Sequence, residues 1–233
     1  MLISDKKFQT EEFCQEYPIL IEHLSAVLEH NQAINLTGIH TMEAGKVFHI
    51  EDSLAALHEL ERASVGTIAD LGSGAGYPGI PLAIVSKRPT TLIESNQKKT
   101  RFLSDFIKTN NLTDLLRVYA GRSEELSLQE PAGFSVVTAR AVAELTILLE
   151  LAYPLLSIKG RLIAFKAQPQ AEELEKATQN AEKLSFELIS TRQYCLEFNN
   201  EMHQRQILVY EKTGTSAVKL PRRPGMATKR PLA

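Results

Sequence analysis

One acidic residue and three glycines at alternate positions carry the strongest chemical signal in this chain. Asp70 ends a short apolar, β-branched run, where ligands bind in open α/β sheets, and Gly72, Gly74 and Gly76 follow it. Glycine tolerates a positive φ and lets the backbone approach a ligand closely. Pro78 suits the first turn of a helix, whose free N–H groups face a bound group. The pattern predicts a strand, a tight loop and a helix that together bind a nucleotide cofactor.

Two classes of cofactor site share this geometry. Residues 74–79 match the dinucleotide fingerprint G-x-G-x-x-G, and Glu94 follows at roughly the expected 20 residues. In a dinucleotide site the first glycine directly follows the strand, whereas here the order is acid-x-Gly-x-Gly-x-Gly. That order resembles the first motif of class I S-adenosylmethionine-dependent methyltransferases. A chain of 233 residues also leaves little room for the second domain of many dehydrogenases, although an NAD-dependent oxidoreductase remains the alternative.

Beyond the glycine loop, extended and helical patterns alternate. Strands are expected at 67–71, 91–94, 116–119, 135–139 and 161–165, and helices at 78–85, 97–108, 143–156 and 169–184. This alternation predicts right-handed crossovers and a parallel sheet covered on both faces. Two further extended stretches, 186–196 and 205–211, have no helix between them and predict an antiparallel terminal pair.

The alternating pattern predicts an α/β fold, and the resemblance of the glycine motif implies the class I, Rossmann-like methyltransferase type. The resemblance also implies a sheet of seven strands, mostly parallel, with a reversed terminal strand. An apolar stripe at helical spacing between residues 9 and 31, and a second helical series from His49 to Leu60, predict an N-terminal helical cap. We therefore expect a helical cap (1–62), a methyltransferase domain (63–212) and a basic, flexible tail (213–233).

Candidate ligand-binding side chains follow the ends of the other expected strands. Glu94 ends the second strand, where a carboxylate can accept both ribose hydroxyls of an adenosine. Ser123 and Glu124 follow the third strand and are placed to hold an adenine edge. Arg140 follows the fourth strand among apolar neighbours, so its charge needs a partner.

Composition describes an ordinary globular chain. No apolar run approaches the roughly 20 residues that span a bilayer, and no signal peptide is visible. Cys14 and Cys195 lack metal-ligand spacing, so we expect reduced thiols, no metal, and a cytoplasmic monomer. Five cations and no acid lie after residue 212, which leaves −7 for the rest of a chain whose net charge is −2. Contact with a polyanion must therefore depend on local patches.

A series of short motifs, in order and at consistent spacing from about residue 31 to 166, points to one family. The motifs are Asn35-Leu36-Thr37, His49 with Asp52-Ser53-Leu54, the glycine motif from Asp70 to Leu82, Lys98 with Arg101-Phe102-Leu103, Arg122-x-Glu124-Glu125, Ala139-Arg140-Ala141 and, in the tail, Pro221-Arg222-Arg223-x-Gly225. Together they resemble the bacterial small-subunit ribosomal RNA guanine-N7 methyltransferase G family. An older name is the glucose-inhibited division protein B family.

The resemblance implies S-adenosylmethionine as cofactor and a guanine of 16S ribosomal RNA as methyl acceptor. The glycine loop already predicts that Asp70, Gly74 and Gly76 contact the cofactor. The resemblance implies further cofactor contacts by Gly72, Tyr77, Glu94, Ser123, Glu124 and Arg140. Two positions depart from the family pattern: Glu94 stands where many relatives have Asp, and Ala167 follows Lys166 where glycine is common.

The expected reaction needs no general base. Guanine N7 has a lone pair in the ring plane and no proton to lose, so it can attack the sulfonium methyl directly. The enzyme must align the two reactants and stabilise an acceptor that becomes cationic. We therefore assign Asn35, His49 and Asp52, together with Arg140, to the catalytic pocket, but not to proton abstraction.

Binding to RNA needs cations for the phosphates and an unstacked target base. The candidate phosphate contacts are Lys98, Arg101, Arg122, Lys166, Arg222 and Arg223. Tyr77 could stack on the cofactor or on the base. A non-catalytic RNA-binding assembly factor with the same fold remains a second alternative.

Overall fold

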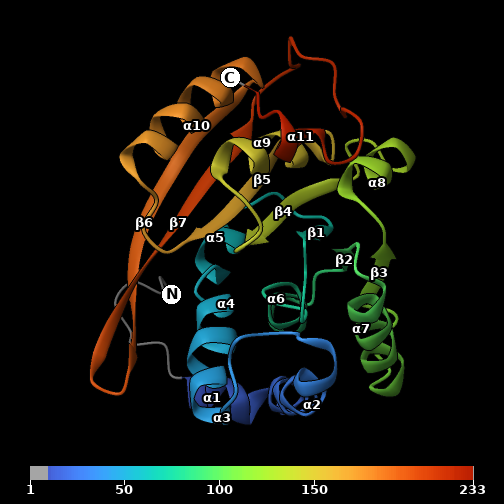
Figure 1. The fold of residues 1–233 in the computed structure, drawn as a ribbon, viewed down its shortest axis with the longest axis vertical. Helices are drawn as coiled ribbons and strands as arrows, with labels where there is room; N and C mark the ends of the chain where they lie inside the picture. The colour runs from blue at the N-terminus through green and yellow to red at the C-terminus, as the bar shows by residue number, and fades with distance from the viewer. Residues whose placement is uncertain (1–9, 233) are drawn as a thin grey trace.

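The computed structural model describes residues 10–232 and contains one seven-stranded sheet (Figure 1). The strand order is β3-β2-β1-β4-β5-β7-β6. The bounds are β1 (Ile68–Leu71), β2 (Thr90–Glu94), β3 (Leu116–Ala120), β4 (Phe134–Arg140), β5 (Leu156–Lys166), β6 (Phe186–Phe198) and β7 (Glu201–Lys212). Among these seven strands, β7 runs in the direction opposite to the other six. The predicted parallel sheet with a reversed last strand is confirmed, and that strand lies between β5 and β6.

Helices connect the parallel strands as the alternation predicted. They are α6 (Gly79–Ser86), α7 (Gln97–Thr109), α8 (Ser123–Gln129), α9 (Leu145–Ala152) and α10 (Ala171–Lys183). Helix α7 begins where the sequence predicted because Asn96 caps it, accepting hydrogen bonds from the amides of Lys98 and Lys99. Helix α8 was not predicted, and α9 is shorter than the apolar run that predicted it.

A series of helices precedes the sheet, within the segment expected to be a cap. They are α1 (Thr10–Glu16), α2 (Ile19–Ile34), α3 (Met42–Gly45), the π-helix η1 (Lys46–Glu51), α4 (Asp52–Leu54) and α5 (Leu57–Glu61). Residues 1–9 of the expected cap lie outside the described residues. Leu20, Leu24 and Ile50 share one buried apolar cluster with Ile68 of β1 and Ile163 of β5. The helices are therefore part of the same core as one face of the sheet.

The two last strands form a long hairpin that reaches beyond the rest of the sheet and alongside the cap helices (Figure 1). Its turn residues Asn199 and Asn200 both have positive φ, as tight hairpin turns require. From β6, Arg192 donates hydrogen bonds to both oxygens of the buried Glu59 carboxylate in α5, at 2.6 and 2.8 Å. A charged pair therefore joins the hairpin to the cap.

The expected flexible tail is instead packed against the domain. In the C-terminal segment (residues 213–232), Val218, Leu220 and Leu232 contact the second apolar cluster, on the face of the sheet covered by α9 and α10. A short helix, α11 (Met226–Lys229), lies near α9 (Figure 1). The prediction of flexibility came from the basic composition of the segment. Composition does not reveal that Arg222 has a buried partner, which is described below.

The described residues contain neither a membrane-spanning helix nor a cluster of metal-binding side chains. Between residues 10 and 232, no helix is both long and apolar enough to cross a membrane. In the same range, no group of three or more His, Cys, Asp or Glu side chains is arranged to hold a metal ion.

The Arg192–Glu59 pair predicts a measurable contribution to stability. Arg192→Ala leaves a buried carboxylate without its guanidinium, so we expect the free energy of unfolding to fall by about 3 kcal/mol in urea denaturation. Lys176→Ala is the matched control, because it breaks an exposed pair with Glu172 and should leave the unfolding midpoint unchanged. Equal midpoints for the two variants would show that the hairpin is not held in this way.

Candidate active site

The glycine turn is supported from beneath by Asp70, at the end of β1. Asp70 is fully buried, and its carboxylate accepts hydrogen bonds from Thr138 Oγ1 (2.8 Å) and Gly79 N (3.2 Å). Burial raises the pKa of this carboxyl to about 6. Both oxygens are used within the protein, so Asp70 joins β1, β4 and the start of α6. This geometry favours a positioning role over the direct cofactor contact that we expected.

The three glycines of the turn all have positive φ but different surroundings. A Cβ on Gly74 would meet nothing nearer than Gly72 O at 3.8 Å, so the space above Gly74 can admit a ligand. A Cβ on Gly76 would lie 2.5 Å from Ile80 Cδ1, which makes Gly76 a packing requirement. A Cβ on Gly72 would lie 2.8 Å from Val142 Cγ2, so the loop after β4 covers that end of the turn.

Glu94 lies beside this turn, at the end of β2. Its Oε2 accepts a hydrogen bond from Gly74 N at 3.0 Å, and its Oε1 accepts one from Asn96 N at 2.7 Å. The two amides fix the orientation of the carboxylate. Each oxygen keeps acceptor capacity, so the group can still bind the hydroxyls of a sugar.

Ser123 and Glu124 begin α8, at the end of β3. Both are buried, and the Ser123 hydroxyl donates to Glu124 Oε2 at 3.2 Å. The other oxygen, Oε1, accepts a hydrogen bond from Gly225 N in the C-terminal segment at 2.8 Å. Sequence reasoning placed Glu124 at the adenine edge but did not foresee this contact.

Tyr77 packs between two histidines. Its ring stacks on His49 (centroids 4.4 Å apart, planes at 9°) and lies tilted against His23 (4.7 Å), with Arg140 Cζ 5.6 Å from the ring centroid. Burial raises the pKa of Tyr77 well above its ordinary value, so the phenol stays neutral. Within residues 10–232 its buried hydroxyl has no hydrogen-bond partner. The ring connects the glycine turn to the polar network around Arg140.

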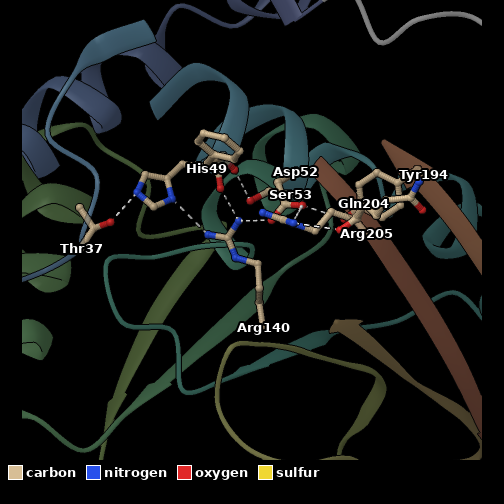
Figure 2. A network of polar contacts seen from close by, with 9 residues as sticks. Thr37, His49, Asp52, Ser53, Arg140, Tyr194, Gln204 and Arg205 are labelled. Carbon is tan, nitrogen blue, oxygen red and sulfur yellow. Dashed lines mark hydrogen bonds and ion pairs between the residues drawn. The ribbon is translucent and has the colours of Figure 1, made fainter. Parts of the chain in front are cut away.

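That network centres on the ion pair between Arg140 and Asp52 (Figure 2). Arg140 Nη1 donates to Asp52 Oδ2 at 2.7 Å and to Phe48 O at 2.9 Å. The hydroxyl of Tyr194 donates to Asp52 Oδ1 at 2.7 Å, and Arg205 Nε lies 3.8 Å from the same oxygen. Side chains from β4, the cap and the hairpin therefore meet at one carboxylate, and the partner that Arg140 needed is Asp52.

The protonation state of His49 follows from its neighbours. Arg140 Nη2, which can only donate, lies 3.4 Å from His49 Nδ1, so Nδ1 is the acceptor. The proton is therefore on Nε2, which donates to Thr37 Oγ1 at 2.8 Å. Burial, with the charge of Arg140, lowers the pKa of His49 to about 3. His49 is neutral at physiological pH, and its lone pair faces a cation.

Beside this network is a cavity of about 590 Å³. His49, Asp52 and Arg140 line it, together with Lys166, which the sequence predicted as a phosphate contact. The other lining residues, to which sequence reasoning assigned no role, are Ile39, Phe48, Ala141, Phe165, Ala167, His203 and Arg205. Arg205 Cζ lies 5.9 Å from the Phe48 ring centroid, so the cavity combines aromatic surface with positive charge. The hairpin residues carried no sequence signal, because only the antiparallel return of β7 brings them to the pocket.

Asn35 does not join the network. It is exposed and ends α2 in the left-handed conformation (φ 49°), and its backbone N–H donates to Asn31 O. The buried residue is Asn31, whose Nδ2 donates to Thr37 O and whose Oδ1 accepts from Thr37 N. Asn35 therefore shapes the loop as a helix cap, and Asn31 places Thr37 against His49. The catalytic assignment of Asn35 is not supported by its position.

The candidate RNA-binding cations divide into two groups. Lys98, Arg101, Arg122 and Arg223 are exposed. Lys166 instead forms an ion pair with Glu173 at 2.6 Å.

Arg222, the remaining candidate, forms a two-point ion pair with Glu150, at 2.7 and 2.5 Å. Its guanidinium is therefore already paired within the protein, and phosphate binding by Arg222 is not supported.

Comparison with known proteins identifies the family. A family model described as rRNA small subunit methyltransferase G matches residues 16–206. The chain belongs to this family. Among curated members, the protein of Carboxydothermus hydrogenoformans is 37% identical over 209 residues, covering 88% of this chain and 87% of its own. That of Staphylococcus saprophyticus is 33% identical over 232 residues, covering 99% and 92%. Both are named ribosomal RNA small subunit methyltransferase G.

Solved structures agree with the fold of the family. The crystal structure of M. jannaschii TYW2 in complex with AdoMet is 20% identical, with a TM-score of 0.51, covering 67% of this chain and 75% of that one. A precorrin-6y C5,15-methyltransferase from Geobacter metallireducens is 15% identical, with a TM-score of 0.53, covering 70% and 88%. At these identities the likeness concerns the fold, which is that of class I methyltransferases.

The depressed pKa of His49 predicts a pH dependence of stability. Histidine in unfolded chains becomes protonated below about pH 6.5, whereas His49 in the folded protein becomes protonated only near pH 3. The free energy of unfolding therefore decreases as the pH is lowered through this window. Between about pH 7.5 and 5.5 the wild type should lose about 1 kcal/mol more than His49→Gln in urea denaturation. Asp70 titrates in both proteins, so its contribution cancels when the wild type is compared with His49→Gln. Identical slopes would mean that His49 ionises normally in the folded state.

Proposed function

We propose that this protein transfers a methyl group from S-adenosylmethionine to N7 of a guanine in small-subunit ribosomal RNA. Family membership supports the cofactor and the RNA class. The observation that carries the mechanism is that His49 and Asp52, the titratable groups of the pocket nearest Arg140, are both committed to hydrogen bonds. Neither is available as a base, and N7 attack requires none.

The residues around the glycine turn fit the cofactor. The open surface above Gly74 leaves room for a ligand, and the carboxylate of Glu94 is oriented beside it with acceptor capacity for ribose hydroxyls. Ser123 and Glu124 would hold the adenine side. When bound, the cofactor supplies an electrophilic methyl group on a sulfonium.

The cavity beside Arg140 would hold the target base. Phe48 and Phe165 offer apolar contact to a purine, and Arg205 offers donors to phosphate or base oxygens. The ion pair of Asp52 with Arg140 keeps the cavity wall in one arrangement. The chain's contribution is alignment, which can lower a barrier by roughly 7–11 kcal/mol.

Exposed cations would bind the surrounding RNA phosphates. Lys98 and Arg101 on α7, Arg122 before α8, and Arg223 in the C-terminal segment remain candidates. As part of the proposal, the protein acts as a monomer in the cytoplasm, where its RNA substrate is made. The family match leaves the NAD-dependent alternative without support.

Labelled S-adenosylmethionine and small ribosomal subunits provide the test of the reaction. We expect label in one guanosine of 16S RNA. We expect no label when that guanosine is replaced by 7-deazaguanosine, which lacks the attacking nitrogen. Because no enzyme base is used, kcat/KM should lack a rising limb between about pH 6 and 8. Cofactor and RNA binding without label would instead favour the non-catalytic assembly factor.

Removing the Arg140 guanidinium tests the alignment. Arg140→Ala leaves Asp52 uncompensated and releases the cavity wall, so methyl transfer should fall by about 10²-fold. Lys176→Ala, on the exposed face of α10, is the control and should transfer at the wild-type rate. Normal transfer by Arg140→Ala would remove this residue from the site.

A further inference from the structure

The C-terminal segment (213–232) connects three helices that are separate in sequence. Figure 1 shows the segment passing near α8, α9 and α10. Along the chain, Arg222 pairs with Glu150 of α9, Gly225 contacts Glu124 of α8, and Leu232 O accepts a hydrogen bond from Asn180 Nδ2 of α10 at 2.7 Å. Helix α8 carries the residues expected at the adenine side of the cofactor. The segment therefore links the far face of the sheet to one edge of the proposed cofactor site.

Arg222 is the centre of this link. Its Nε and Nη2 donate to the two oxygens of Glu150, and Nη2 also donates to Arg230 O at 2.8 Å. Only 3% of the Glu150 side chain is exposed, so this carboxylate depends on the guanidinium for compensation. The contact to Arg230 closes the turn that contains α11. Lysine could not make all three contacts from a single planar group.

Inside that turn, Gly225 presents its amide to Glu124. The amide donates to Glu124 Oε1 at 2.8 Å, and the Ser123 hydroxyl holds the other oxygen at 3.2 Å. Gly225 has φ +79°, a conformation that favours glycine, and that conformation aims the amide at α8. With 7% of its surface exposed, Glu124 has little freedom to turn elsewhere.

We propose that the C-terminal segment positions the adenine side of the cofactor site, with Arg222 as a positioning residue that acts through Gly225 on Glu124. This inference rests on the proposed function, because it takes Ser123 and Glu124 as the adenine-side residues. It reassigns Arg222 from RNA phosphate binding to cofactor affinity. The neighbouring Arg223 is exposed and keeps its proposed contact with RNA.

Isothermal titration with S-adenosylmethionine compares the two adjacent arginines. Arg222→Ala should raise the dissociation constant about tenfold, the size of one lost hydrogen bond to a charged group. It should raise the constant for 5′-methylthioadenosine, which lacks the amino-acid part, by the same factor. Arg223→Ala should leave both constants unchanged and weaken binding to RNA. Equal cofactor affinities for the two variants would overturn the proposal.

Gly225→Ala covers the case in which Arg222→Ala fails to fold. A Cβ at this position meets nothing within 4 Å, so no contact is lost, but the positive φ becomes unfavourable and the amide shifts from Glu124. The Arg222–Glu150 pair stays intact. We expect a several-fold weaker cofactor affinity at a nearly unchanged melting temperature, and an unchanged affinity would count against the proposal.

Hydrogen exchange tests whether docking of the segment and binding of the cofactor are coupled, which a purely structural role of Arg222 would not require. If the segment favours cofactor binding, the cofactor must favour the docked segment by the same factor. Saturating S-adenosylmethionine should therefore slow exchange in residues 222–230 of the wild type and leave the hairpin turn at 199–200 unchanged. No slowing in a protein that binds the cofactor would overturn the inference alone, whereas a wild type that does not bind it would overturn the proposed function.

Discussion

The need to compensate one buried carboxylate organises the pocket. Asp52 is 6% exposed, and a charge in such a place is tolerated only with close donors. Its donors are Arg140 from β4 and Tyr194 from β6, so the cap can occupy only the position at which both reach it. The same arginine fixes the tautomer of His49, against which Tyr77 stacks. This ion pair thus links the cap, the sheet and the glycine turn, in addition to the apolar core that the cap and the sheet share.

On the cofactor side, some residues shape the glycine turn and others can contact the ligand. Asp70 and Gly76 serve the shape of the turn, whereas Gly74 and Glu94 present the surface that a ligand can use. The acid of the motif is thus a fully buried support for the loop, whereas the second acid, 24 residues later, is partly exposed and can accept further hydrogen bonds from a ligand. Residues of one motif can therefore be jointly required while only some of them contact the ligand.

What the sequence could predict was local. Strand, loop and helix around Asp70 follow from residue types within a few positions, and alternation along the chain gave the parallel sheet. What it could not predict depends on partners distant in sequence. Arg222 looked like a solvent-facing cation because Glu150 lies in an apolar helix 72 residues earlier. Likewise Arg205 and His203 reach the pocket only through the hairpin, and the π-helix that carries His49 has no composition signal.

The hairpin has a consequence for how the molecule assembles. Tyr194 lies 142 residues from Asp52, and Arg192 lies 133 residues from Glu59. Contacts of such separation carry a large loop-closure entropy and form late on a folding pathway. The cap helices are made early in translation, whereas Tyr194 and Arg192 become available to Asp52 and Glu59 only after β6 has been made. The pocket beside Arg140 therefore forms only when the fold is nearly complete, so partly folded chains lack it.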